Sequence, residues 1–113
     1  MGIVVDPSPF DIVIPRGATF RLSFQWRLDD APVDLSAATV RAQVRNRYQS
    51  ATAAAFTASG DAAGHVTANL PASVTAAMLA TDGVWDLEVE WPDGDVCRLL
   101  MGKAEIIPEV TRP

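Results

Sequence analysis

The chain has little of what catalytic and metal-binding proteins need, because its 113 residues include one cysteine and one histidine. Cys97 has no partner for an internal disulfide, so the sequence does not support secretion into an oxidising compartment. One histidine and one cysteine do not make a zinc ligand set. His65 has no serine in a Gly-x-Ser-x-Gly context to work with. The sequence therefore predicts no catalytic residues, no metal and no cofactor.

Other absences narrow the possible partners. No glycine-rich phosphate loop occurs, and no run approaches the roughly 18 apolar residues of a membrane span. The start of the chain has no basic segment typical of a signal peptide. The net charge of −5 disfavours a nucleic acid partner, since binding to phosphates needs a basic surface. We expect no nucleic acid and no membrane partner, and folding in a cytoplasm.

What the chain does have is a clear period-two pattern. From Phe20 to Leu28 every second residue is apolar and the residues between are polar, which is typical of a half-buried strand. The same alternation runs from Trp85 to Trp91. With 49% hydrophobic and 20% charged residues the chain is too apolar for disorder. Its length fits one domain.

Weaker signals fill in the remaining elements. Further strands are predicted at 10–14, 39–47, 51–58, 65–70 and 96–107. Gly102 is a candidate bulge in the last of these, whose two faces are both apolar. Residues 72–80 change to a helical period, with Val74, Met78 and Leu79 on one face and Ser73 as a possible cap. Residues 92–95 form a predicted hairpin turn. The sequence predicts an all-β fold: an immunoglobulin-like antiparallel β-sandwich of about seven strands with one short helical crossover.

The pattern divides the chain into an N-terminal arm (1–9), the sandwich domain (10–107) and a C-terminal tail (108–113). Neither end has enough apolar residues to add much to the core. The ends are either frayed or straps that order against a neighbour. Their candidate interface residues are Ile3, Val4, Val5, Glu109, Val110 and Arg112.

Charged residues on the outward sides of the predicted strands have two interpretations. One is a set of cross-strand ion pairs within a sheet, each worth well under about 1 kcal/mol. The other is complementary patches that join copies or neighbours in an assembly. We favour the first. The residues concerned are Arg21, Arg27, Arg41, Arg45 and Arg47 on the early strands, and Asp86, Glu88 and Glu90 on a later one.

Two acidic turns raise the question of calcium. Asp93 and Asp95 flank Gly94, and Asp29 and Asp30 precede a proline. Aspartate and glycine are expected in such turns for backbone geometry alone, so we favour turns over calcium sites.

Several segments together resemble a known group of proteins. They are Phe10–Phe20, Pro32–Ser36, Val40–Arg45, Val84–Val89 and Leu99–Arg112. In these segments the chain resembles small β-sandwich proteins of tailed bacteriophages and prophages. It is similar to the immunoglobulin-like N-terminal domain of phage upper-baseplate proteins and to the LtfC-like sandwich of actinobacterial phages.

The resemblance implies a multi-copy virion component, assembled in the bacterial host cytoplasm, whose partners are other virion proteins of the tail, baseplate or capsid. We expect a non-enzymatic structural protein that binds neighbouring subunits, including its own copies, through sheet edges and terminal arms. A capsid-decorating head protein is one alternative. A carbohydrate- or receptor-binding module, with Trp91 or Tyr48 stacking on sugar, is another, although the inward phase of Trp91 argues against it. A small hydrolase is the least favoured.

Overall fold

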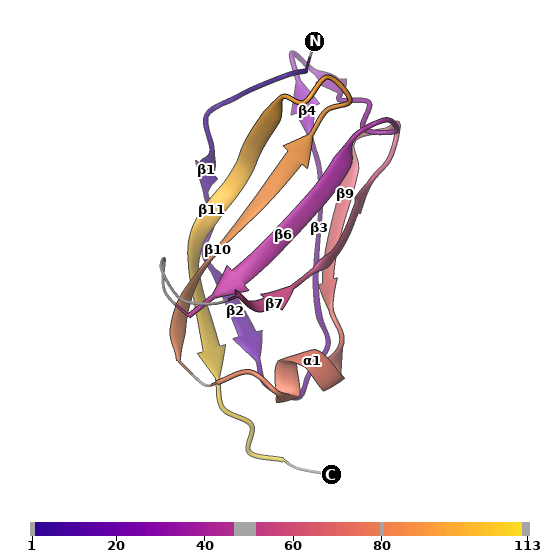
Figure 1. Cartoon of the computed structure of the whole chain (residues 1–113). Coiled ribbons are helices and arrows are strands. Elements are labelled where there is room, and N and C mark those ends of the chain that lie inside the picture. The colour runs from indigo at the N-terminus through magenta and orange to yellow at the C-terminus, as the bar shows by residue number, and fades with distance from the viewer. Residues whose placement is uncertain (1, 47–51, 80, 112–113) are drawn as a thin grey trace.

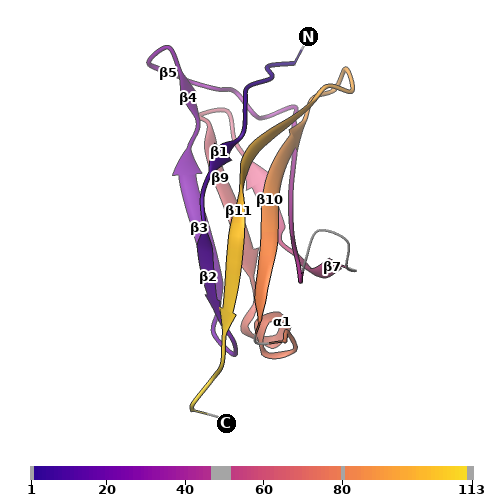
Figure 2. The same ribbon diagram turned by 90° about the vertical axis from the view of Figure 1, so that its left-hand side faces the viewer.

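The computed structural model describes residues 2–46, 52–79 and 81–111 and has the form of a β-sandwich (Figures 1 and 2). The larger sheet has the order β1-β11-β10-β6-β7, with β2 also paired to β11, and the smaller sheet has the order β3-β9-β8. The larger sheet consists of β1 (Ser8–Pro9), β2 (Ile12–Pro15), β6 (Thr39–Arg45), β7 (Thr52–Ala55), β10 (Asp82–Glu90) and β11 (Val96–Ile107). The smaller sheet consists of β3 (Phe20–Gln25), β8 (Thr57–Gly60) and β9 (His65–Leu70). The predicted all-β sandwich with one short helix is confirmed.

Pairing within the sheets is antiparallel except at the N-terminal end. There β1 and β2 both pair with β11 in parallel. A small separate hairpin joins β4 (Arg27–Leu28) to β5 (Ala31–Pro32). Asp29 and Asp30 form its turn with φ values of 51° and 63°. Positive φ at both central residues is the type I′ geometry, which explains why two aspartates stand there.

The two alternating stripes behave differently in the structure. On β10 the side chains of Trp85, Leu87 and Val89 are buried, as predicted. The first stripe was predicted as one strand from Phe20 to Leu28, but β3 ends at Gln25. The reason lies in the backbone of Trp26, whose N–H donates to Gly64 O (2.8 Å) while its carbonyl accepts from Val33 N (2.9 Å). The N–H bond continues the pairing with the chain before β9, but the carbonyl bonds to Val33 instead, so the regular ladder ends at Gln25.

A bulge in β11 explains why both of its faces read as apolar. Opposite β10, Leu87 pairs with Leu100 but Glu88 pairs with Arg98, so Leu99 is an extra residue. The extra residue reverses the alternation. The odd-numbered Cys97 and Leu99 are buried up to the bulge, and the even-numbered Ala104 and Ile106 are buried beyond it.

The predicted bulge at Gly102 was wrong. Gly102 pairs regularly with Trp85. A Cβ at position 102 would lie 2.4 Å from the carbonyl oxygen of Phe10, so glycine stands there to let the N-terminal chain approach.

The helical crossover is shorter than predicted. Helix α1 spans Ala72–Ala76, and its N-cap is Pro71, with no side-chain cap. Ser73 therefore lies inside the helix. Met78 is buried, but Leu79, which the helical period assigned to the same face, is 68% exposed. The buried hydroxyl of Thr75 donates to Ala18 O (2.7 Å) and ties the helix to the segment just before β3.

A line of aromatic rings crosses the interior. Trp85 contacts Phe10 at a centroid distance of 6.3 Å and Phe56 at 6.1 Å, and Phe56 contacts Phe20 at 5.9 Å. The buried Phe56 lies between β7 and β8, where the chain passes from the larger sheet to the smaller. The indole N–H of Trp85 donates to Phe10 O (2.7 Å), so its one polar atom is satisfied.

Leu87 and Leu79 give a matched pair for testing this core. Replacing the fully buried Leu87 by alanine should lower the free energy of unfolding by about 2–5 kcal/mol, because it removes apolar contacts and leaves a cavity. Leu79→Ala should change it by less than about 0.5 kcal/mol. Chemical denaturation of both variants measures this, and equal effects would contradict the placement of β10.

Candidate protein-binding surfaces

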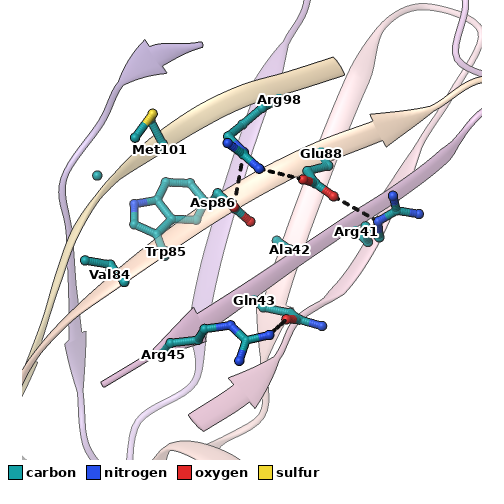
Figure 3. Close-up of a pocket in the computed structure, with 11 residues that line it drawn as sticks. Arg41, Ala42, Gln43, Arg45, Val84, Trp85, Asp86, Glu88, Arg98 and Met101 are labelled. Atoms are coloured by element: carbon teal, nitrogen blue, oxygen red, sulfur yellow. Dashed lines mark hydrogen bonds and ion pairs between the residues drawn. The ribbon is translucent and has the colours of Figure 1, made fainter. Parts of the chain in front are cut away.

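The outward face of the larger sheet carries a network of ion pairs built around Glu88 (Figure 3). Strand register places Glu88 beside Arg41 of β6 on one side and beside Arg98 of β11 on the other. The Glu88 carboxylate accepts from Arg41 Nε (3.1 Å) and from Arg98 Nη2 (3.1 Å). Arg41 also pairs with Glu90, and Arg98 pairs with Asp86 (3.2 Å). The network thus links three adjacent strands.

Each residue of this network is at least partly exposed, and its two arginines are paired with three carboxylates. Hydrogen bonds to Glu90 and Glu88 raise the pKa of Arg41 above its ordinary value. Burial raises the pKa of Asp86, the nearby Glu88 adds to this rise, and Arg98 opposes it. Exposed pairs of this kind stabilise a protein by less than about 1 kcal/mol each. Their main effect is to pair the charges of this face within the domain.

Two shallow depressions lie on this larger sheet. One, of about 400 Å³, is lined by all of the ion-pair network except Glu90, together with residues that include Arg45, Val84 and Met101. The other, of about 800 Å³, lies toward the opposite end of the strands, over β2 and the ends of β10 and β11 that pair with each other at Asp82–Glu105. Its lining includes Val13, which is 51% exposed.

The predicted charged residues are only partly brought together. The interpretation as ion pairs within one sheet is confirmed for Arg41 with Glu88 and Glu90. Asp86 pairs instead with Arg98, whose outward position could not be predicted from the alternation because the bulge at Leu99 reverses it. Arg45 lies beside the network in the same depression and donates to Gln43 Oε1 (3.1 Å). The other two lie elsewhere: Arg27 donates to Asp30 O (2.6 Å), and Arg21 is exposed on β3. Arg47 lies outside the described residues.

The N-terminal arm lies against its own domain, which corrects the expectation that it adds little there. Val5 packs against the core, and its N–H contacts the sulfur of buried Cys97 at 3.4 Å. The carbonyl of Ile3 accepts from the indole N–H of Trp91 (2.8 Å). β1 then continues the arm along β11. The arm still presents apolar surface, since Ile3 is 38% and Val4 is 62% exposed.

The C-terminal tail leaves the opposite end of the sandwich (Figure 1). Val110 is 97% exposed. Glu109 is half-buried, with its carboxylate against Gly17 in the turn before β3. Arg112 lies outside the described residues.

The acidic turns are structured by their own carboxylates. Asp93 accepts from the N–H of Asp95 (2.9 Å) and of Gly2 (2.8 Å). Asp61 accepts from the N–H groups of Ala63 and His65 and contacts the His65 ring nitrogen at 3.3 Å. Hydrogen bonds from the following backbone lower the pKa of Asp93 and of Asp61 below the ordinary value. Within the described ranges, no group of three or more histidine, cysteine or acidic residues is placed to hold a metal ion.

His65 occupies an exposed turn position. It stands at the first position of β9, and its side chain is 59% exposed. Asp61 and His65 stand on the two sides of the turn between β8 and β9, so their contact closes this hairpin. None of the helices in the described ranges is long and apolar enough to cross a membrane.

No family model matches this chain, and no curated protein matches it. Among solved structures, the ZIG-8–RIG-5 IG1–IG1 heterodimer matches with 12% identity and a TM-score of 0.47, over 95% of this chain and 90% of that chain. A family 123 glycoside hydrolase from Clostridium perfringens matches with 7% identity and a TM-score of 0.44, over 92% of this chain and 24% of that chain.

Asp86 gives a test of the electrostatics of the network. Its pKa is raised in the folded state, so the folded protein binds a proton there more readily than the unfolded chain. Stability then falls as pH rises from the ordinary value of 3.8 through the raised one. Asp86→Asn should gain stability relative to the wild type between acid and neutral pH, as measured by denaturation at a series of pH values.

The matched control has the opposite sign. The pKa of Asp61 is lowered, so its stabilising effect is present at neutral pH and is lost as pH falls through the folded-state pKa. Asp61→Asn should therefore be less stable than the wild type at neutral pH, with the difference closing in acid. If Asp86→Asn behaved like this control, the pair with Arg98 would outweigh burial, contrary to our account.

Proposed function

We propose that this protein is a non-enzymatic structural subunit of a tailed-bacteriophage virion, which binds neighbouring subunits through sheet edges and terminal arms. The segments that carry the resemblance to phage sandwich proteins support this proposal. They include β2 and parts of β6, β10 and β11, and so belong largely to one sheet. A tail or baseplate position is our first proposal, and decoration of the capsid is the alternative.

The observation that supports a binding role most directly is that apolar side chains are exposed to solvent at the two ends of the chain. Ile3, Val4 and Val110 are exposed apolar residues at the two ends of the chain. The outward face of the larger sheet, by contrast, has its charges paired within the domain. Contacts with neighbours are therefore expected at edges and ends, in an assembly that forms in the bacterial cytoplasm.

Two other proposals find less support. Sugar stacking on Trp91 would need an open face of its indole ring. Trp26 lies 6.2 Å from that ring, centroid to centroid, and Gly2 packs so closely on it that a Cβ there would lie 2.2 Å from the indole. Tyr48, the other aromatic residue considered, lies outside the described residues. A hydrolase would have to rely on His65, whose contact with Asp61 serves a hairpin turn.

Mass spectrometry of purified particles tests the proposed function. Particles released by a strain carrying this gene would be banded on a density gradient and treated with nuclease and high salt. Peptides of this protein should remain with the particles in a fixed ratio to the major capsid protein, while an abundant host cytoplasmic protein is depleted. Separation of heads from tails then distinguishes the two positions. Abundance in the lysate with absence from the particles would contradict the proposal.

A further inference from the structure

Most edges of the sandwich are guarded against pairing with another strand. The β1–β2 edge consists of two short strands that contain Pro9 and Pro15, which have no N–H to donate. On the far side of β8, Leu35 and Val40 lie against Gly60, and Leu35 N donates to Asp61 O (3.0 Å). β7 has four residues. These are the features by which natural sheets avoid unwanted edge contacts.

The edge of β3 has none of these guards. β3 is a regular strand of six residues without proline, and β9 is its only partner in the described part of the chain. It forms the outer margin of the smaller sheet (Figure 2). Phe20, Leu22 and Phe24 point toward the core and yet remain half-buried. The core is thus incompletely covered along this edge.

The hydrogen bonds between β3 and β9 show which backbone groups of β3 face its open edge. Trp26 N donates to Gly64 O, and the register continues this pairing through Phe24–Val66 and Leu22–Ala68. Even-numbered residues therefore direct their N–H and C=O groups to β9. Because these groups alternate along a strand, the odd-numbered Arg21, Ser23 and Gln25 direct theirs to the open edge.

We propose that the open edge of β3 pairs with the same edge of a second copy, antiparallel and about a two-fold axis at Ser23. This register sets Ser23 opposite Ser23 and Arg21 opposite Gln25, so all three outward-facing residues exchange both of their hydrogen bonds. No other two-fold register uses all three. Leu22 lies opposite Phe24 of the second copy, which covers the half-buried apolar row. The two three-stranded sheets then form one continuous sheet, as in strand addition to other sheet edges.

Charge also favours this register over its neighbours. Centring the pair on Arg21 would set two guanidinium groups directly opposite each other, which is destabilising. Centring it on Ser23 separates Arg21 from its symmetry mate by four residues, or about 13 Å. That exceeds the Debye length of roughly 8 Å at physiological ionic strength. The outward side chains of β3 include no carboxylate, so the acidic net charge of the chain is not concentrated there.

The inference deepens the proposed function, on which it rests for its setting, by naming a partner for one edge. A contact made by three residues on each side is small, so the free protein should dimerise only at high concentration. In an assembly with many copies the local concentration is high, and the same contact then contributes through avidity.

Sedimentation velocity on the whole chain, up to millimolar concentration, tests the proposal. The wild type should show a concentration-dependent dimer. Ser23→Lys and Ser23→Glu should each lower the association constant at least about tenfold, because each sets two like charges together at the two-fold axis. An equimolar mixture of the two variants should recover the dimer. Ser59→Lys, on the same outward face of β8, is the matched control and should dimerise like the wild type.

Circular dichroism and thermal unfolding check that the exposed position 23 variants keep the fold. A wild type that stays monomeric, a dimer unaffected by Ser23→Lys, or a mixture that stays monomeric would each overturn the proposal. These results are distinguishable from failure of the proposed function. A dimer of the purified protein that is absent from virions would contradict the virion role and leave the β3 contact intact.

Discussion

The structure depends on the burial of Trp85 between the two sheets. Its ring contacts Phe10 from the N-terminal segment and Phe56 from the crossing between sheets, and its N–H is bonded to the Phe10 carbonyl. A buried tryptophan stabilises a core only if its N–H finds a partner. The N-terminal chain supplies that partner, and Gly102 lets it approach. Core packing and the parallel pairing of β2 with β11 are therefore one constraint.

The burial of Trp85 also determines which surfaces of the molecule are charged and which remain apolar. With the inward side chains of β10 fixed, Asp86, Glu88 and Glu90 face outward between the arginines of β6 and β11, where they are paired. Such pairs stabilise little, but they leave the sheet face charged and polar and so unsuited to nonspecific apolar contact. The margins are different, because the arm and the β3 edge retain apolar side chains and backbone groups. Binding is expected there.

The sequence predicts the parts of the fold that rest on period two. Alternation from Trp85 to Trp91 identified β10, and the sandwich class followed from several such stretches. What it missed depends on contacts between distant residues. The bulge at Leu99 changes which residues of β11 face the core, and no local signal marks it. Arg98 was missed for the same reason. The docking of the arm depends on Trp91 and Cys97, which lie about ninety residues away in sequence.

The predictions of the helix at 72–80 and of a single strand from Phe20 to Leu28 were inaccurate for a simpler reason. A helical period over a few residues is weak information, and Leu79 matches it by chance while lying in solvent. Trp26 continues the alternation of β3, but its carbonyl bonds to the N–H of Val33 instead of to the neighbouring strand, and β3 ends before it. In both places tertiary contacts prevail over a local pattern. The candidate charged site was predictable to the extent that its residues share one sheet.

Amide hydrogen exchange, measured by NMR on the dilute monomer, tests most directly the claim that these constraints leave one edge of the sandwich open. The amides of Leu22 and Phe24, which bond to β9, should exchange slowly, as should that of Leu87 in β10. The amides of Arg21, Ser23 and Gln25 should exchange fast, because they face the open edge. Equal protection of the two sets along β3 would contradict the account, since it would mean that the edge is covered or that the strand is not formed.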